Sequence, residues 1–358
     1  MINKTIKLNS NLLYLLIVIC STLSILVGYN FKIDMNRDKT DPGFMGSKPF
    51  LNDGTLCKAG SDDELCIKDI INDFSSNQSN ILFLGNSQTG AVNDFSIDDI
   101  NYVTLIKNQF YKNNNQKKIK GIWFPNANIV EFKKINLLLE ACNINIELLI
   151  IPVFLDDMRD YSVRDKIKEY SENNCFSNNL SKKNKPLKFG NLVISNNKIK
   201  SKIFIFSKLE NLNKYFRLDL YKFRNWIFNI KPESIRKIRP AAYKSNINAL
   251  KNILKNRNIN SQRTIVYIPP LLNYKNQKKI PYDRKEYKKF KTDIENLCKE
   301  YFCNFYNLET LVPDQFWGFK SSTSLFSEEK EIDFMHFTAK GHQIMATKFL
   351  EILYKHKN

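Results

Sequence analysis

The chain has 358 residues, of which 43% are hydrophobic, 13% aromatic and 25% charged. This composition excludes a collagen, a coiled coil, a polytopic membrane protein and a wholly disordered chain. The 55 Lys and Arg residues exceed the 36 Asp and Glu residues, giving a net charge of +19. A charge of this sign indicates an anionic neighbour, such as nucleic acid, anionic lipid or an acidic polymer.

One uninterrupted apolar run lies near the N-terminus, at residues 12–29, and contains no charged residue. A helix of this length spans about 27 Å, close to the hydrocarbon thickness of a bilayer. Residues 1–11 contain Lys4 and Lys7 and predict a short basic leader that stays in the cytoplasm. We therefore expect a single-pass membrane protein whose remaining residues lie outside the cytoplasm.

A cleaved signal peptide is the alternative to this anchor. No Ala-x-Ala cleavage motif follows the apolar run, which favours an uncleaved span. Cys20 would suggest a lipoprotein, but Ile19 stands where such a signal needs a small residue. The sequence leaves cleavage of the anchor open.

Beyond the anchor, the pattern is that of one large α/β domain. Residues 30–78 are polar and predict a linker followed by a first helix near residues 62–74. Short apolar runs then predict buried strands at 80–84, 120–124, 147–153, 264–268 and 302–306. Helical patterns are found at 129–142, 286–301 and 342–354. Strands that alternate with helices predict, over residues 79–358, a three-layer sandwich with a parallel, flavodoxin-like sheet.

A basic insertion at about residues 160–262 separates the third and fourth strands. Residues 181–263 contain 21 Lys and Arg against three Asp and Glu, a difference of +18. Within it, residues 212–228 can form a helix rich in aromatic and basic side chains. Such a helix fits contact with anionic lipid or with a membrane partner. Alternatively it packs on its own domain and exposes a basic face. We expect no nucleic-acid partner, because the anchor places this segment at a membrane.

Six of the seven cysteines lie outside the apolar run. Cys57 and Cys66 can close a short loop, as can Cys298 and Cys303, and an exported domain permits both disulfides. The alternative is that Cys142 and Cys298 are ordinary buried thiols on helix faces. No cysteine or histidine pair has zinc-ligand spacing, so we expect no metal, and no cofactor is implied.

A serine follows the first predicted strand. Ser87 stands in Gly85-Asn86-Ser87-Gln88-Thr89, where glycine permits a sharp turn and the serine is presented at the carboxyl end of the strand. A nucleophile could occupy this position, but a serine there is also an ordinary helix N-cap.

An acid and a histidine stand three residues apart near the C-terminus. Asp333 and His336 would face the same side of one turn before the last helix. The carboxylate can then hold Nδ1–H, which leaves Nε2 free to accept a proton from a serine. The chain has only three histidines. We expect His342 to begin the terminal helix, and His356 lies in the tail.

Taken together, these two stretches resemble the SGNH/GDSL hydrolase superfamily over about residues 80–353. Gly85 to Thr89 is similar to its first block, where Asp often replaces Asn86, and Asp333 to His342 is similar to its last. The resemblance implies that Ser87 is the nucleophile, His336 the general base and Asp333 the residue that orients it.

The middle blocks depart from the family pattern. Asn126 stands where the family has a glycine whose N–H binds the oxyanion, and Asn128 lies nearby. Asp156 replaces the usual oxyanion-binding Asn, and a carboxylate is a poor donor unless protonated. Asp156 or its neighbour Asp157 can instead pair with Arg159 and shape the substrate pocket. A helix N-cap with a surface ion pair is the other interpretation.

These departures and the anchor are similar to membrane-anchored partners of acyltransferases, such as the proteins of teichoic-acid D-alanylation and exopolysaccharide O-acetylation. The resemblance implies an esterase or O-acyltransferase acting on acyl esters of a cell-envelope polysaccharide or lipid-linked polymer. The implied partner is a polytopic membrane-bound O-acyltransferase. Two alternatives are a non-catalytic scaffold for that partner and a lysophospholipase.

Overall fold

A computed structural model describes most of the chain beyond the linker. The described residues are 47–49, 55–58, 65–74, 80–94, 96, 99–112, 117–169, 220, 222–230, 236–272, 282–320, 322–324 and 329–355. The chain divides into two compact units, Met1–Asp41 with Leu192–Leu220 and Pro42–Asn191 with Tyr221–Asn358. The second unit contains nearly all of the described residues.

The expected leader and anchor, residues 1–29, lie outside the described residues. Among the helices that the structure does describe, none combines the length and the apolar character needed to cross a bilayer.

A six-stranded parallel sheet forms the centre of the second unit, in the strand order β2-β5-β3-β6-β7-β8. The strands are β2 (Leu56–Lys58), β3 (Asn80–Gly85), β5 (Lys118–Trp123), β6 (Leu148–Pro152), β7 (Arg263–Ile268) and β8 (Asn304–Asn307). Without β2, this order is that of a flavodoxin-like sheet, as the sequence predicts. Chain order reverses between β3 and β6, so the loops after these two strands diverge at one edge of the sheet.

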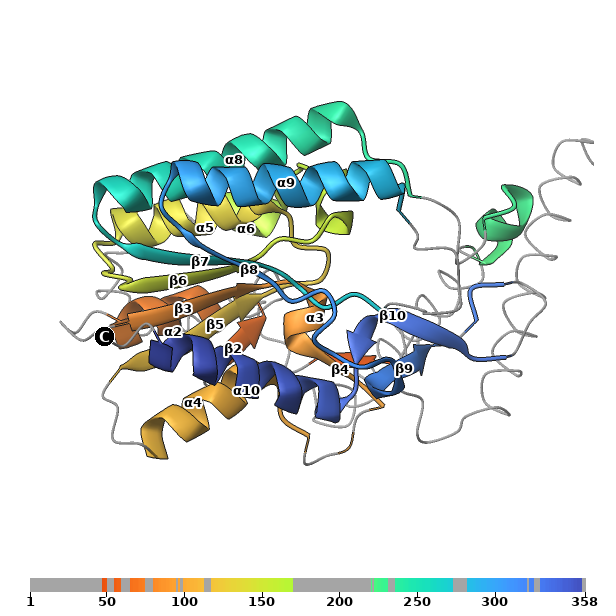
Figure 1. The fold of residues 1–358 in the computed structure, drawn as a ribbon, viewed down its shortest axis with the longest axis horizontal. Coiled ribbons are helices and arrows are strands. Elements are labelled where there is room, and N and C mark those ends of the chain that lie inside the picture. The colour runs from red at the N-terminus through yellow and green to blue at the C-terminus, as the bar shows by residue number, and fades with distance from the viewer. Residues whose placement is uncertain are drawn as a thin grey trace, which may run out of the picture. The chain divides into compact units, whose positions relative to one another are not determined.

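Helices cover both faces of the sheet (Figure 1). One layer contains α2 (Leu65–Phe74), α5 (Ile129–Ala141), α6 (Asp165–Glu169), α8 (Pro240–Ile259) and α9 (Arg284–Glu300). The other contains α4 (Tyr102–Lys112) and α10 (Ala339–Lys355). Alternation along β3 shows how the two cores arise, because Leu82 and Leu84 join the first and Ile81 and Phe83 the second.

All five predicted strands are present, with ends shifted by up to two residues. They are recognisable in the sequence because a strand buried on both faces is a continuous apolar run. β2 was not predicted; it lies in the stretch interpreted as linker. α8 was also missed. It lies within the basic insertion, packs against α5 and β7, and belongs to the crossover from β6 to β7.

Two small antiparallel pairs stand at the carboxyl edge of the sheet. β1 (Ser47–Pro49) pairs with β4 (Ala91–Asn93), and β9 (Trp317–Lys320) pairs with β10 (Glu331–Phe337). Figure 1 shows β4, β9 and β10 gathered beside the short helix α3 (Ser87–Gly90). This arrangement brings together segments that are more than two hundred residues apart in sequence.

The cysteines form disulfides more widely than either interpretation of the sequence required. Cys298 and Cys303 are bonded to each other, as the first interpretation predicts. Cys142 is also disulfide-bonded, as is Cys57. The alternative that Cys142 and Cys298 are free buried thiols is therefore wrong. A position on an apolar helix face does not distinguish a free cysteine from a disulfide-bonded one.

Candidate active site

Ser87 lies at the turn from β3 into α3, where the sequence places it. Asn86 caps this short helix, and its Oδ1 accepts a hydrogen bond from the N–H of Gln88 at 3.1 Å. A Cβ on Gly85 would lie 2.6 Å from the Thr89 side chain, so only glycine fits before the cap. The turn therefore holds Ser87, which is partly exposed, between two buried residues.

Asp333 and His336 form a buried pair. His336 Nδ1 lies 2.7 Å from Asp333 Oδ2, and the two side chains are only 5% and 1% exposed. Asp333 Oδ1 accepts from the backbone N–H groups of Met335 and His336 at 2.9 and 3.3 Å. Asn93 Nδ2 donates to Asp333 Oδ2 at 3.0 Å. Four donors thus surround one carboxylate, which fixes the imidazole with its hydrogen on Nδ1.

The predicted helical turn for this pair is wrong, because both residues belong to β10. In a regular strand, residues three apart point to opposite faces. Here the pairing with β9 shifts, since Ile332 lies opposite Phe319 but Phe337 lies opposite Trp317. Residues 333–336 form the bulge between these two registers, and the Asp333 side chain closes it by binding the N–H groups inside it. A bulge thus brings acid and imidazole together where a turn of helix was expected.

Gln88 ties the Ser87 turn to the strand that carries His336. Its Nε2 donates to the carbonyl oxygen of Pro270 at 2.9 Å and to that of Met335 at 3.1 Å. Pro270 follows β7, and Met335 immediately precedes His336. These two bonds fix α3 against β10 and set where Ser87 stands relative to the imidazole. The motif contains Gln88, but nothing local in the sequence shows that its amide reaches two distant carbonyls.

His336 Nε2 is buried, and no residue that the structure describes forms a hydrogen bond with it. The Ser87 hydroxyl is therefore not bonded to it in this structure. A buried imidazole nitrogen with an available lone pair is rare in a folded protein, because most buried polar atoms are hydrogen-bonded. With Nδ1 held by Asp333, this nitrogen can accept a proton from a group placed beside it.

His342 occupies the first turn of α10, as expected, and is fully buried. Its Nδ1 accepts from the N–H of Tyr102 at 3.3 Å, and its Nε2 lies 3.2 Å from the Ala91 carbonyl oxygen. Burial lowers the pKa of this imidazole to about 3. Both nitrogens are engaged, so His342 supports the structure as a neutral ring.

Asn126 and Asn128 differ in what the structure leaves available. Asn126 is exposed and has a φ of 52°, the left-handed region that favours glycine and tolerates asparagine. Arg164 donates to its carbonyl oxygen at 3.1 Å. Asn128, by contrast, caps α5: its Oδ1 accepts from the Glu131 N–H and its Nδ2 donates to the Ser162 carbonyl. Its amide is therefore engaged in the fold, and the prediction that Asn128 binds substrate is not supported.

Asp156 pairs with two arginines of the described part of the chain, and no side chain caps the short helix that it begins. Its Oδ1 accepts from Arg159 at 3.2 Å and its Oδ2 from Arg236 at 2.6 Å. The pairing with Arg159 is the one that the sequence suggested. Arg236 also lies over the Phe334 ring, 4.8 Å from its centre, and so connects the loop after β6 with β10. Both oxygens of Asp156 are engaged by arginines, so its side chain shapes this side of the site.

Asp157 is the acidic residue that reaches the Ser87 turn. Its Oδ2 accepts from Asn86 Nδ2 at 2.7 Å, and burial raises the pKa of this carboxyl well above its usual range. The Asn86 amide is therefore bonded at both ends, to Gln88 on one side and Asp157 on the other. Asp157, in the loop after β6, therefore supports the Ser87 turn, which follows the neighbouring strand β3.

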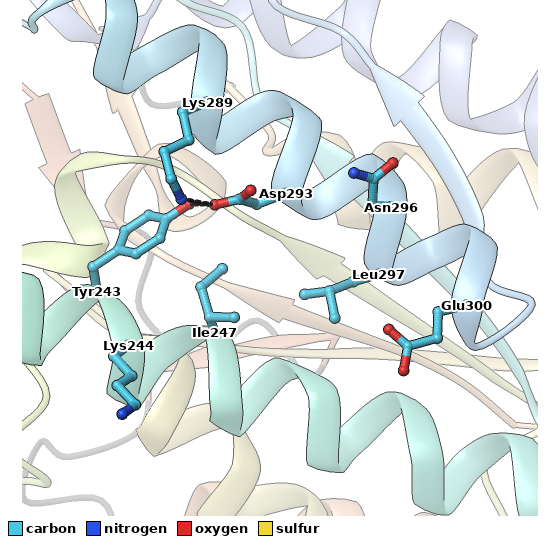
Figure 2. A pocket seen from close by; sticks show the side chains of 8 residues that line it. All are labelled: Tyr243, Lys244, Ile247, Lys289, Asp293, Asn296, Leu297 and Glu300. Carbon is cyan, nitrogen blue, oxygen red and sulfur yellow. Dashed lines mark hydrogen bonds and ion pairs between the residues drawn. The ribbon is translucent and has the colours of Figure 1, made fainter.

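The groove drawn in Figure 2 is unrelated to this site. It has a volume of about 380 Å³, and its lining residues come from α8 and α9 alone. Tyr243 donates to Asp293 at 2.6 Å, and Lys289 pairs with the same carboxylate. Among the described residues, no cluster of three His, Cys, Asp or Glu side chains is arranged to hold a metal ion.

Comparison with known proteins gives structural similarities only. No family model matches the chain, and no curated protein matches its sequence. Among solved structures, it is similar to LAE5, an α/β hydrolase from the metagenome of Lake Arreo, at 10% identity and a TM-score of 0.41. The alignment covers 76% of this chain and 94% of that one.

It is also similar to Axe2, an acetylxylan esterase from Geobacillus stearothermophilus, at 10% identity and a TM-score of 0.40. That alignment covers 76% of this chain and 93% of Axe2. A chain from Parabacteroides merdae described as a GDSL-like lipase gives 13% identity and a TM-score of 0.39, with 76% and 94% covered. Similarities at this level assign neither a family nor an activity, so function must be inferred from the site itself.

Proposed function

We propose that this chain is a serine esterase or O-acyltransferase in which Ser87, His336 and Asp333 act as nucleophile, general base and orienting acid. One observation carries the proposal: His336 Nε2 is buried without a hydrogen-bond partner among the described residues, on a ring held by Asp333, beside the turn that presents Ser87. A pair that served only the fold would be expected to satisfy both imidazole nitrogens, as His342 does.

The reaction follows from these positions. Ser87 Oγ attacks the carbonyl carbon of an ester as His336 Nε2 takes its proton. The tetrahedral intermediate then expels the alcohol, which receives that proton, and an acyl group remains on Ser87. Water or a sugar hydroxyl attacks the acyl-enzyme next, so hydrolysis and transfer share the first half of the mechanism. Asp333 keeps the ring oriented and stabilises the imidazolium.

Backbone groups are the proposed donors to the oxyanion. Asn128 and Asp156 are engaged elsewhere. The left-handed backbone of Asn126 gives the loop after β5 the conformation that a glycine would supply. We therefore assign oxyanion binding to the N–H groups of Ser87 and Asn126. In this assignment Asn126 acts through its main chain and its side chain is dispensable.

The proposed substrate is an acyl ester on a cell-envelope polysaccharide or a lipid-linked polymer. The proposed setting is the outer face of a membrane, with residues 12–29 as the anchor and a polytopic membrane-bound O-acyltransferase as partner. The apolar run and the net charge of +19 support this setting. A scaffold role beside the same acyltransferase is the alternative, and an activity assay separates the two.

That assay is hydrolysis of 4-nitrophenyl acetate by the full-length protein in detergent. We expect Ser87→Ala to lose the activity, while Ser96→Ala, which changes an exposed serine, keeps it. Adding an oligosaccharide acceptor and searching for its acetylated form by mass spectrometry separates transfer from hydrolysis. Equal activity of wild type and Ser87→Ala would contradict the nucleophile, and a folded but inactive wild type would favour the scaffold.

A further inference from the structure

A short helical segment within residues 222–230 displays apolar side chains on the outside of the molecule. Five of its side chains are 40–69% exposed. They are Phe223, Trp226, Ile227, Phe228 and Ile230. We call this set the 223–230 apolar surface. The rings of Phe223 and Trp226 contact each other, with centres 5.7 Å apart. Figure 1 shows the segment, in green, standing apart from the helices that cover the sheet.

The segment is oriented by a polar residue on its inner side. Asn225 is only 4% exposed, and its Nδ2 donates to the Thr323 carbonyl oxygen at 3.2 Å. Thr323 in turn donates through its N–H to Glu331, the first residue of β10, at 2.8 Å. An amphipathic helix that packed on its own domain would bury its aromatic residues and expose its amide. For the described residues the observed orientation is the reverse, with the aromatic side chains outside and the Asn225 amide inside.

The charge of the segment indicates what covers it. The described residues 222–230 include Lys222 and Arg224 and no acidic residue, and the surrounding stretch 181–263 has a charge difference of +18. Aromatic and aliphatic side chains beside Lys and Arg are typical of surfaces that enter the headgroup region of anionic bilayers. A second copy would bring the same positive charge against it, and a nucleic acid would not stabilise five exposed apolar side chains.

We infer that the 223–230 apolar surface binds an anionic lipid bilayer and holds the β9–β10 hairpin close to it. The inference goes beyond the proposed function, which places the protein at a membrane through residues 12–29, because it assigns a second lipid contact to the domain that carries Ser87. It also has a consequence for the site. Asn225 bonds to Thr323, and Thr323 bonds to Glu331, the first residue of β10. Because β10 also carries Asp333 and His336, these bonds connect the proposed lipid contact to the strand of the proposed catalytic pair.

Trp226 reports on this contact without interference from the expected anchor. The chain has three tryptophans, and Trp123 and Trp317 are only 1% and 5% exposed against 56% for Trp226. The experiment reconstitutes the full-length protein into phosphatidylcholine bilayers with or without phosphatidylglycerol, using brominated acyl chains as quenchers. Trp226→Phe, measured in parallel, isolates the signal of the exposed ring.

We expect bromolipid quenching of Trp226 to be about twofold greater in bilayers that contain phosphatidylglycerol, and to fall when salt is added. Lys222→Glu should reduce this quenching, and the double variant Ile227→Ser, Phe228→Ser should abolish it. Hydrolysis of a soluble ester should be unchanged in these variants, so failure of this inference and failure of the proposed function are distinguishable.

Two results would overturn the inference. Trp226 that stays open to aqueous acrylamide and is not quenched by bromolipid would show that the surface faces water. Protection from acrylamide that rises with protein concentration, again without bromolipid quenching, would show that a second copy covers it.

Discussion

Two clusters of polar residues lie at the carboxyl edge of the same sheet, and they differ in what they leave unbonded. At the junction of α3 with β10, Asp333 accepts four hydrogen bonds from described residues, whereas His336 Nε2 has no bond to any of them. In the loops after β5 and β6, Asn128 uses both ends of its amide in capping, and both oxygens of Asp156 bind arginines. Of these two clusters, the first keeps a reactive atom available and the second does not.

This difference teaches that position at a strand end is not enough to assign chemistry. Polar residues gather at such edges because loops need caps and ion pairs as much as sites need ligands. The informative observation is a buried polar atom that the fold leaves unsatisfied, since leaving it so costs free energy that the fold could have avoided. Substitutions in one cluster, with the other as control, can therefore test the distinction.

The largest expected effect comes from breaking the acid–imidazole pair. Asp333→Asn replaces an acceptor by an amide and allows the wrong ring tautomer, so ester hydrolysis should fall about 10³- to 10⁴-fold. Asp156→Asn is the matched control from the second cluster and should stay within about tenfold of wild type, because it only weakens ion pairs. Rates on a soluble ester measure both. Similar losses in the two variants would erase the distinction between the clusters.

The second effect concerns stability against pH and separates His342 from His336. Burial lowers the folded-state pKa of His342 to about 3, while an unfolded histidine titrates near 6.5. The unfolded state therefore binds more protons than the folded state between these two pH values. The contribution of His342 to the free energy of unfolding is complete above about pH 6.5 and is lost as the pH falls towards 3. Between these two values, the free energy of unfolding changes by up to about 1.4 kcal/mol per pH unit.

Urea midpoints measured across this range for wild type and His342→Asn test the assignment. The variant retains polar atoms at the position but has no titrating ring, so its midpoint should fall less steeply with acid. Parallel curves for the two proteins would show that His342 is not a neutral buried ring.

The third effect is on the alignment of Ser87 with His336. Gln88→Leu removes the bonds to the Pro270 and Met335 carbonyls and frees α3 to shift against β10. We expect kcat to fall about 10- to 100-fold with KM nearly unchanged, because misplacement of reacting groups affects the chemical step. Gln343→Leu, at an exposed position of α10, is the control. A loss confined to KM would instead place Gln88 in substrate binding.

The smallest effect belongs to the second cluster. Asn128→Ala removes the cap of α5 and should lower the free energy of unfolding by about 1 kcal/mol. Activity per folded molecule should stay at the wild-type level, as should that of Asn126→Gly, which keeps the left-handed backbone. Thermal denaturation together with active-site titration separates the two quantities. A loss of activity in fully folded Asn128→Ala would show that Asn128 takes part in the reaction.

Much of the fold could be predicted because the sheet has a local signature in the sequence. The five predicted strands are apolar runs, and the glycine before Ser87 marks the turn. What could not be predicted depends on distant partners. Asn93 binds Asp333 from another segment, and Gln88 reaches Met335 across 247 residues. The sequence also predicts a helical turn where β10 has a bulge. Both structures bring residues three apart, such as Asp333 and His336, to the same side of the chain.

The most direct test of the proposed mechanism is covalent labelling of Ser87. Full-length protein in membranes is treated with a fluorophosphonate probe and the modified peptide is mapped by mass spectrometry, with Ser87→Ala and His336→Ala in parallel. We predict a single modified residue, Ser87, labelled much more slowly when His336 is absent. Labelling that ignores the His336 substitution, or that maps to another serine, would contradict the claim that this imidazole activates this hydroxyl.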